Sequence, residues 1–174
     1  MSRIYIPAAV FILLVLEGTL FQILISFNHT IEMTLVPRFL VVMIILIGIH
    51  FGRQSSIVYG MIFGFFYDVV YTQLLGVYTF GIAFIGYVFV YYHKRIQDSL
   101  LIQLLIIVGA ITFFEYYQFG LYRLIGITEM AAPLFVLERL VPSIVLNSVF
   151  AILIYYPTKK LFDYVKRQEN LRER

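Results

Sequence analysis

The sequence lacks cysteine and tryptophan altogether, and only 13% of its 174 residues carry a charged side chain. Without cysteine, a disulfide bond, a thiol nucleophile and a thiolate metal ligand are all excluded. The three histidines are scattered, so the sequence predicts no metal site, and it contains no cofactor motif. The H-E-x-x-H and G-x-S-x-G motifs and a glycine-rich phosphate loop are also missing, so the chain is not predicted to be an enzyme.

Hydrophobic residues make up 61% of the chain, and its mean hydropathy is +0.91. Soluble domains are about 45–50% apolar and about 25% charged, so this composition predicts an all-α integral membrane protein. A helix needs about 20 mostly apolar residues to cross a bilayer. Six such segments predict a six-transmembrane-helix bundle in a single domain covering residues 1–174, with spans at about 4–26, 36–51, 55–72, 74–92, 100–122 and 133–156.

The basic residues predict how these spans are oriented. With both termini in the cytoplasm, ten of the 13 Lys and Arg residues fall on the inside: Arg3, Arg53, Lys94, Arg95, Lys159, Lys160, Lys166, Arg167, Arg172 and Arg174. The other three, Arg38, Arg123 and Arg139, fall in the outer half. This is the positive-inside bias of membrane proteins, and it brings the basic tail near anionic lipid headgroups. A net charge of only +3 does not predict nucleic acid binding.

An aspartate lies within the apolar stretch FGFFYDVVY of the third predicted span. Gly60, Gly64 and Asp68 recur at intervals of four residues, so they share one helix face. Small residues at this spacing allow a second helix to approach closely, and Asp68 is therefore expected to point into the bundle. Helix packing is one interpretation of this face, and a surface for a partner is the alternative.

The outer half of the predicted bundle holds three acidic residues and three arginines: Asp68, Glu115, Glu138, Arg38, Arg123 and Arg139. Arginine binds a carboxylate through two parallel hydrogen bonds, which suits ion pairs inside a bundle. We therefore expect one outer network of these groups. It serves either to stabilise the bundle or to bind a partner or ligand.

Two further polar features lie within the predicted spans. Pro142 is expected to bend the sixth span, with Arg139, Ser143 and Asn147 along one face. Glu17, near the middle of the first span, is expected to be a buried acid. An interior hydrogen bond to Asn147 or to a tyrosine hydroxyl would hold it, and a role in binding a proton or ligand is the alternative.

The run YGMIFGFFYDVVYTQLLGVYTFG at 59–81 resembles the signature of the MreD family of rod shape-determining membrane proteins, in its Firmicute form. The residues that carry the resemblance are Gly60, Gly64, Asp68, Leu75 and Gly76. The segments PRFLVVMII (37–45), FFEYYQFG (113–120) and LERLVPSIVLN (137–147) are also similar to the family in their order and spacing.

This resemblance implies a noncatalytic component of the machinery that builds the lateral cell wall, located in the bacterial cytoplasmic membrane. It implies MreC as a direct partner, and the actin-like MreB, the glycosyltransferase RodA and a class B penicillin-binding protein as members of the same complex. The helix with Gly60, Gly64 and Asp68 and the bend at Glu138–Pro142 are the candidate surfaces for MreC. The basic tail is expected to face MreB or anionic membrane lipids.

The resemblance also implies a six-helix arrangement similar to the substrate-binding components of energy-coupling-factor transporters. A small-molecule transporter subunit of that kind is therefore the alternative function. Such subunits often carry an A-x-x-x-A motif in the first helix for docking a transport partner. The first span, FILLVLEGTLF, contains no such motif, and this lowers the weight of the alternative.

Overall fold

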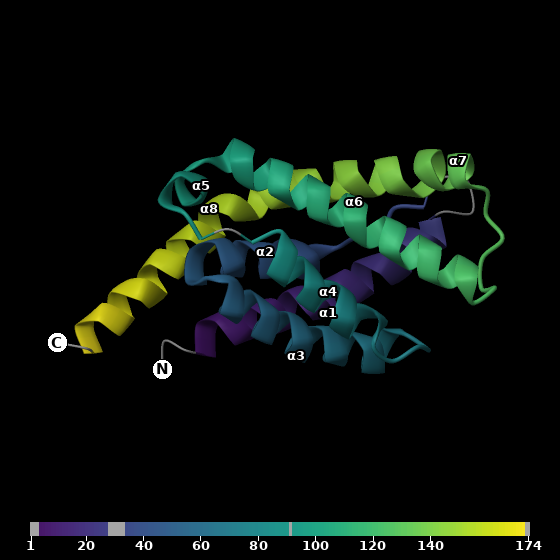
Figure 1. Ribbon diagram of the computed structural model, residues 1–174. Coiled ribbons are helices and arrows are strands. Elements are labelled where there is room, and N and C mark those ends of the chain that lie inside the picture. The colour runs from purple at the N-terminus through teal and green to yellow at the C-terminus, as the bar shows by residue number, and fades with distance from the viewer. Residues whose placement is uncertain (1–3, 28–33, 91, 173–174) are drawn as a thin grey trace.

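The computed structural model describes residues 4–27, 34–90 and 92–172, and these residues form helices and short connections without strands (Figure 1). The all-helical prediction is therefore confirmed for this part of the chain. In order, the elements are α1 (Tyr5–Phe27), α2 (Phe39–Phe51), α3 (Arg53–Tyr71), α4 (Val77–Val88), α5 (Lys94–Asp98), α6 (Leu100–Leu124), α7 (Ala132–Phe135), the π-helical turn η3 (Val136–Leu140) and α8 (Val141–Arg172).

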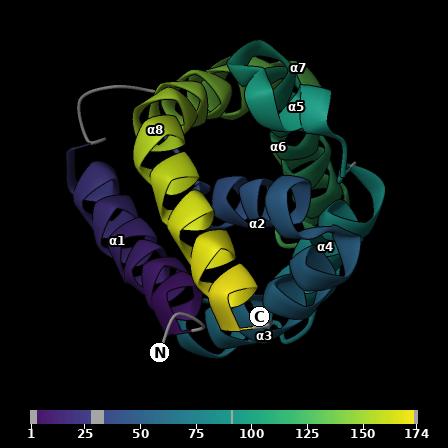
Figure 2. The same ribbon diagram turned by 90° about the vertical axis from the view of Figure 1, so that its left-hand side faces the viewer.

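Helix α2 lies at the centre of the bundle (Figure 2), and every residue from Phe39 to His50 is buried. Helices α1, α3, α4, α6 and α8 pack around it. A helix that is apolar on all sides is covered either by other protein elements or by lipid, and the neighbouring helices cover α2. The sequence FLVVMIILIGIHF accordingly has no polar face, since none of its sides meets water.

In the part of the chain that the structure describes, three helical segments are long and apolar enough to cross a membrane: Tyr5–Leu24, Leu100–Leu124 and Ala132–Gln168. Helices α2 and α4 are also apolar, but they have only 13 and 12 residues. Large apolar side chains such as Phe11, Phe65 and Leu153 are exposed on the outside of the bundle. The chain is therefore a helical membrane protein, whereas the count of six crossings stays a prediction.

The two short helices begin later than the sequence predicts. The predicted spans 36–51 and 74–92 include residues 36–38 and 74–76, which are not helical. At 1.5 Å per residue, α2 and α4 are each about 20 Å long, which is less than the thickness of about 30 Å of a hydrocarbon core. Their first backbone N–H groups therefore lie inside the bundle and need acceptors from other helices.

The basic residues of α5 and of the end of α8 gather at one end of the bundle. The start of α1, helix α5 and the end of α8 lie at this end, and α7 lies at the opposite end (Figure 1). Lys94 and Arg95 belong to α5, and the basic residues of the tail belong to the last part of α8. The side of the membrane that this end faces stays a prediction. Arg3 and Arg174, which support that prediction, lie outside the described residues, as does the side chain of Arg172.

The C-terminal half of α8 crosses the end of α2 (Figure 2). Phe162 and Val165 are buried, and the ring of Phe162 lies 5.0 Å from that of His50 and 5.1 Å from that of Phe51. Pro157 lies inside this helix and removes one hydrogen bond from it. The basic segment after Pro157 is therefore packed on the bundle and is not a detached tail.

The glycine face of α3 packs directly against α4. A Cβ atom on Gly64 would lie 2.8 Å from Cα of Thr79, and one on Gly60 would lie 3.2 Å from Cα of Ala83. We expect Gly64→Ala to push the helices apart and to lower the free energy of unfolding by about 1–3 kcal/mol, measured by denaturant unfolding in detergent. Gly120→Ala is the matched control, because a Cβ at Gly120 meets no atom within 4 Å. An equal loss in both variants would contradict the close approach of α3 and α4.

Candidate functional site

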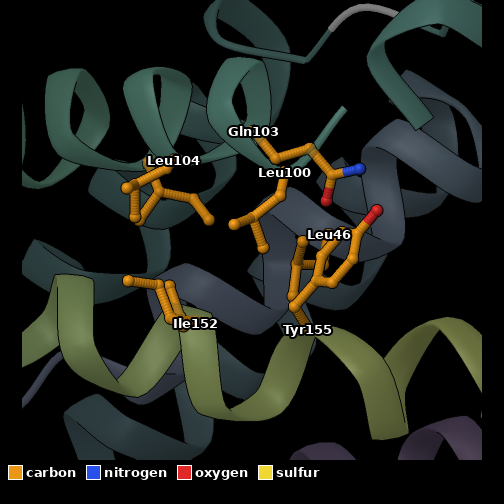
Figure 3. A pocket seen from close by; sticks show the side chains of 8 residues that line it. Leu46, Leu100, Gln103, Leu104, Ile152 and Tyr155 are labelled. Carbon is orange, nitrogen blue, oxygen red and sulfur yellow. The ribbon is translucent and has the colours of Figure 1, made fainter. Parts of the chain in front are cut away.

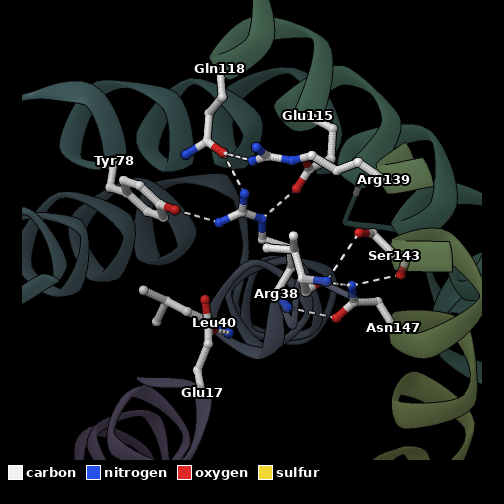
Figure 4. Close-up of polar contacts among 10 residues, drawn as sticks. Glu17, Arg38, Leu40, Tyr78, Glu115, Gln118, Arg139, Ser143 and Asn147 are labelled. Atoms are coloured by element: carbon white, nitrogen blue, oxygen red, sulfur yellow. Dashed lines mark hydrogen bonds and ion pairs between the residues drawn. The ribbon is translucent and has the colours of Figure 1, made fainter. Parts of the chain in front are cut away.

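Arg38 lies immediately before α2, and its side chain is only 1% exposed. Its Nε donates to Oε1 of Glu115 on α6 at 2.6 Å (Figure 4). Its two terminal nitrogens donate to the hydroxyl oxygen of Tyr78 on α4 and to Oε1 of Gln118 on α6. The guanidinium carbon also lies 5.1 Å from the centre of the Phe114 ring. A buried charge is costly unless it is paired and hydrogen-bonded, and these contacts meet that requirement.

Glu115 is shared by two arginines. Its Oε2 accepts a hydrogen bond from Nε of Arg139 on η3 at 2.9 Å, and the Glu115 side chain is 0% exposed. Nη2 of Arg139 also lies 3.5 Å from Oε1 of Gln118, and this second arginine is 27% exposed. Arg38, Glu115 and Arg139 form an ionic triad. The triad connects the segment before α2 to α6 and to η3.

Two polar residues of α8 hold the main chain before α2. The N–H of Val36 donates to Oγ of Ser143 at 3.2 Å, and the N–H of Arg38 donates to Oδ1 of Asn147 at 2.7 Å. The side-chain amide of Asn147 donates in turn to the carbonyl oxygen of Val36 at 2.9 Å. Nonhelical backbone at membrane depth must find partners within the protein. This requirement explains the polar face that the sequence shows after Pro142.

Pro142 also helps to hold the segment before α2 against α8, through a main-chain hydrogen bond. It has no N–H to donate to the carbonyl of Glu138, four residues earlier. That carbonyl accepts instead from the N–H of Thr34 at 2.7 Å. The turn before Pro142 is π-helical over Val136–Leu140. The structure therefore has an irregular turn where the sequence predicts a bend.

Glu17 on α1 caps the first turn of α2. It is 1% exposed, and its Oε2 accepts from the N–H of Leu40 at 2.8 Å. The unpaired amides and the dipole of a helix N-terminus favour a carboxylate at this position. The predicted bond from Glu17 to Asn147 is wrong, because Asn147 binds the segment before α2. Tyr67 lies close enough to Glu17 to interact with it electrostatically, and the hydrogen bond to a tyrosine hydroxyl stays a prediction.

Asp68 caps the second short helix, α4, and is 0% exposed. Its Oδ2 accepts from the N–H groups of Gly76 and Thr79 at 3.0 Å and 2.9 Å and from the hydroxyl of Thr79 at 2.7 Å. Its Oδ1 accepts from the N–H of Tyr78 at 2.9 Å. Gly76 has a φ of +100°, a conformation that residues with a Cβ rarely adopt. The aspartate and the glycine eight residues later thus build one helix start.

The single outer network predicted from the sequence is two sites in the structure, the ionic triad and the Asp68 cap, which share Tyr78 but no ion pair. Arg38, Glu115 and Arg139 come together as predicted, but Asp68 takes part in none of the ion pairs found among the described residues. The physical reason is that the N-terminus of α4 supplies Asp68 with amide donors. A carboxylate satisfied in this way needs no arginine.

Two predicted members of the network lie apart from the ionic triad. Arg123 is exposed, and Glu138 contributes its main-chain carbonyl. The prediction also misses Tyr78 and Gln118, which both bind Arg38. Gln118 could have been found, because it follows Glu115 by three residues and shares its face of α6. No sequence signal distinguishes Tyr78 from the other tyrosines.

Each buried acid joins helices of the same chain. Glu17 joins α1 to α2, Asp68 joins α3 to α4, and Glu115 joins α6 to the segment before α2 and to η3. Within the described ranges, no group of three or more His, Cys, Asp or Glu side chains is placed to hold a metal ion. The fold and the site define a helical membrane protein whose buried charges fix its helices to one another.

The chain belongs to the MreD family, described as rod shape-determining protein MreD, which it matches over residues 2–165. A relative from Bacillus subtilis (strain 168), described as "Rod shape-determining protein MreD", is 34% identical over 169 residues, which cover 97% of this chain and 98% of the relative. No solved structure matches the chain significantly. The predicted family resemblance is confirmed, and it assigns the chain a role in determining cell shape.

Proposed function

We propose that the chain is a noncatalytic, multi-pass scaffold of the bacterial cytoplasmic membrane that binds MreC and helps to regulate lateral peptidoglycan synthesis. MreB, RodA and a class B penicillin-binding protein are the other proposed members of the complex. The family supports the role in cell shape. The observation that carries the scaffold role is that Glu17, Asp68 and Glu115 are committed to contacts within the bundle.

The proposed topology has six crossings with both termini in the cytoplasm. Helices α1 and α6 and the continuous α7–η3–α8 segment are each long enough to cross alone. Helices α2 and α4 complete their crossings with the nonhelical segments before them, and the 19 residues of α3 form the remaining crossing. The basic residues near α5 support a cytoplasmic location for that end.

The proposed surface for MreC is the exposed side of η3 and α8 near Pro142. The glycine face of α3 is covered by α4, so it is not free to bind MreC. Leu137, Val141 and Val145 follow one another by four residues and are 67%, 47% and 58% exposed, so they form one apolar ridge. Arg139 lies on the opposite side of the same turn, where it pairs with Glu115, so it is not part of this ridge. A membrane helix of MreC would pack on this ridge.

Photo-cross-linking tests this surface without disturbing the buried helices. A photoreactive phenylalanine analogue replaces Leu137 or Val141 and, as a matched control, Ile12 or Leu16 of α1, which are 58% and 46% exposed. We expect covalent adducts with MreC from the positions on η3 and α8 and few or none from α1. Adducts from α1 alone, or from no position while both proteins are in the membrane, would contradict the proposal.

A substrate-binding transporter subunit is the alternative, and the pocket between α2, α6 and α8 gives it no support. This pocket, lined by Leu46, Leu104 and Ile152 among others, has a volume of about 10 Å³ (Figure 3). That volume is about the minimum for one water molecule, whereas sites for small-molecule ligands occupy about 300–1,000 Å³. Copurification of a small molecule at one-to-one stoichiometry would favour the transporter over the scaffold.

A further inference from the structure

The C-terminal half of α8 has a concave outer face with a volume of about 540 Å³. Three tyrosines, three basic residues and one aspartate line this face, which we call the basic face: Tyr155, Tyr156, Tyr164, Lys159, Lys160, Arg167 and Asp163. These residues share one side of the helix, because they recur at helical spacing. The face lies at the end of the bundle that contains α5, opposite the ionic triad (Figure 1).

Packing on the opposite side of α8 prevents the helix from rotating about its axis, so the basic face points away from the bundle. Thr158, Phe162 and Val165 are 7%, 0% and 1% exposed, so they hold this part of the helix against the bundle. Tyr164 also packs edge-on against Tyr5 of α1, with ring centres 6.0 Å apart. The basic face is therefore presented outward by a helix that cannot rotate freely.

The face keeps a net positive charge after its own contacts are counted. Nζ of Lys159 lies 3.3 Å from Oδ1 of Asp98 on α5, so this lysine is already paired. Lys160 and Arg167 are exposed, and Asp163 is the one acidic residue that lines the face. An occupant is therefore expected to carry negative charge.

The position along α8 places this face where the helix leaves the hydrocarbon. The apolar run AILIYY ends at Tyr156 and is followed directly by PTKK. Ile152 and Leu153, one turn earlier, are 48% and 70% exposed. Tyrosine and lysine are favoured at such a boundary, because each combines an apolar body with a polar tip. An occupant thus meets apolar side chains at one end and cations at the other.

We propose that this face binds an anionic phospholipid of the bilayer. The side chains of Lys160 and Arg167 bind the phosphate, the hydroxyls of Tyr156 and Tyr164 donate to its oxygens, and the acyl chains lie along Ile152 and Leu153. A net-negative headgroup binds more tightly than a zwitterionic one, because the face has more basic than acidic groups. A soluble acidic protein would use the cations but would leave the apolar end of the site uncovered.

The test uses the full chain purified in detergent, with phosphatidylglycerol or phosphatidylcholine added and the bound lipid counted by native mass spectrometry. The site variant is Lys160→Gln with Arg167→Gln. The matched control is Lys94→Gln with Arg95→Gln, which removes two exposed charges at the same end of the bundle. We expect the affinity of the site variant for phosphatidylglycerol to be at least roughly tenfold lower than that of the wild type. The affinity of the control variant should change little, and phosphatidylcholine should bind weakly to every variant.

Circular dichroism verifies the fold of each variant, and the exchange of Lys160→Arg with Arg167→Lys keeps both charges and should retain the lipid. The single variants Lys160→Gln and Lys94→Gln provide the same comparison if a double variant does not fold. The proposal is overturned if the site and control variants lose lipid equally, which would indicate general electrostatic attraction. It is also overturned if the site variant binds lipid like wild type, or if inorganic phosphate displaces the lipid at equal concentration.

Discussion

Replacing Glu115 with glutamine is expected to lower the free energy of unfolding by about 3–5 kcal/mol, the usual cost of removing one partner from a buried ion pair. The substitution keeps the shape of the side chain but leaves two arginines without their carboxylate. Arg38 is affected most, because at 1% exposure it cannot reach water. The measurement is denaturant unfolding in detergent followed by circular dichroism, since the chain has no tryptophan for fluorescence.

A double-mutant cycle separates the loss of the ion pair from the loss of packing. Arg38→Met combined with Glu115→Gln removes both charges of the most buried pair. We expect this variant to be less destabilised than the sum of the two single variants by about 1–3 kcal/mol. Asp98→Asn removes the acid of an exposed pair and should cost less than about 1 kcal/mol. Simple additivity of the two buried substitutions would contradict direct pairing.

The second large effect is expected for Asp68→Leu, which should lower the free energy of unfolding by about 2–4 kcal/mol. Four donors at the start of α4 lose their charged acceptor: the N–H groups of Gly76, Tyr78 and Thr79 and the hydroxyl of Thr79. The loss is local, so amide exchange should accelerate within residues 76–80 more than within α6 or α8. Hydrogen exchange read by mass spectrometry makes this measurement, with denaturant unfolding alongside.

Asp68→Asn is the matched variant for this experiment. It keeps one carbonyl oxygen but loses the second acceptor and the charge, so we expect a smaller loss of about 1 kcal/mol. In a rod-shaped strain that depends on the chain, Asp68→Leu should widen the cells more than Asp68→Asn does, as measured by microscopy. Wild-type exchange at residues 76–80 in Asp68→Leu would show that the aspartate does not hold α4.

Hydropathy predicts where helices occur in this chain but not where two of them begin. A helix is found within each of the six predicted segments, yet α2 and α4 start only at Phe39 and Val77. A hydropathy profile counts apolar side chains and is insensitive to whether the backbone amides are bonded within the helix. The start of α4 depends on an aspartate eight or more residues earlier, and the start of α2 depends on a glutamate of another helix.

The same limit explains the error in the predicted network. A carboxylate within an apolar span shows that some partner exists, but guanidinium groups and helix N-termini both satisfy it. The pairing of Glu115 with Arg38 and Arg139 follows from the scarcity of charges in the outer half of the chain. The pairing of Asp68 with α4 depends on the backbone conformation at Gly76, and the number and type of residues in the sequence do not predict that conformation.

The central position of α2 has a consequence for how the chain folds while it is being synthesised. Glu115 lies 77 residues after Arg38 in the chain, and translation at about 5–20 residues per second delays its arrival by on the order of 4–15 s. During this interval the nascent chain holds an arginine whose future counterion has not yet been synthesised. The bundle therefore cannot close during translation of its first half, and its innermost helix is enclosed only after the last crossings have been inserted.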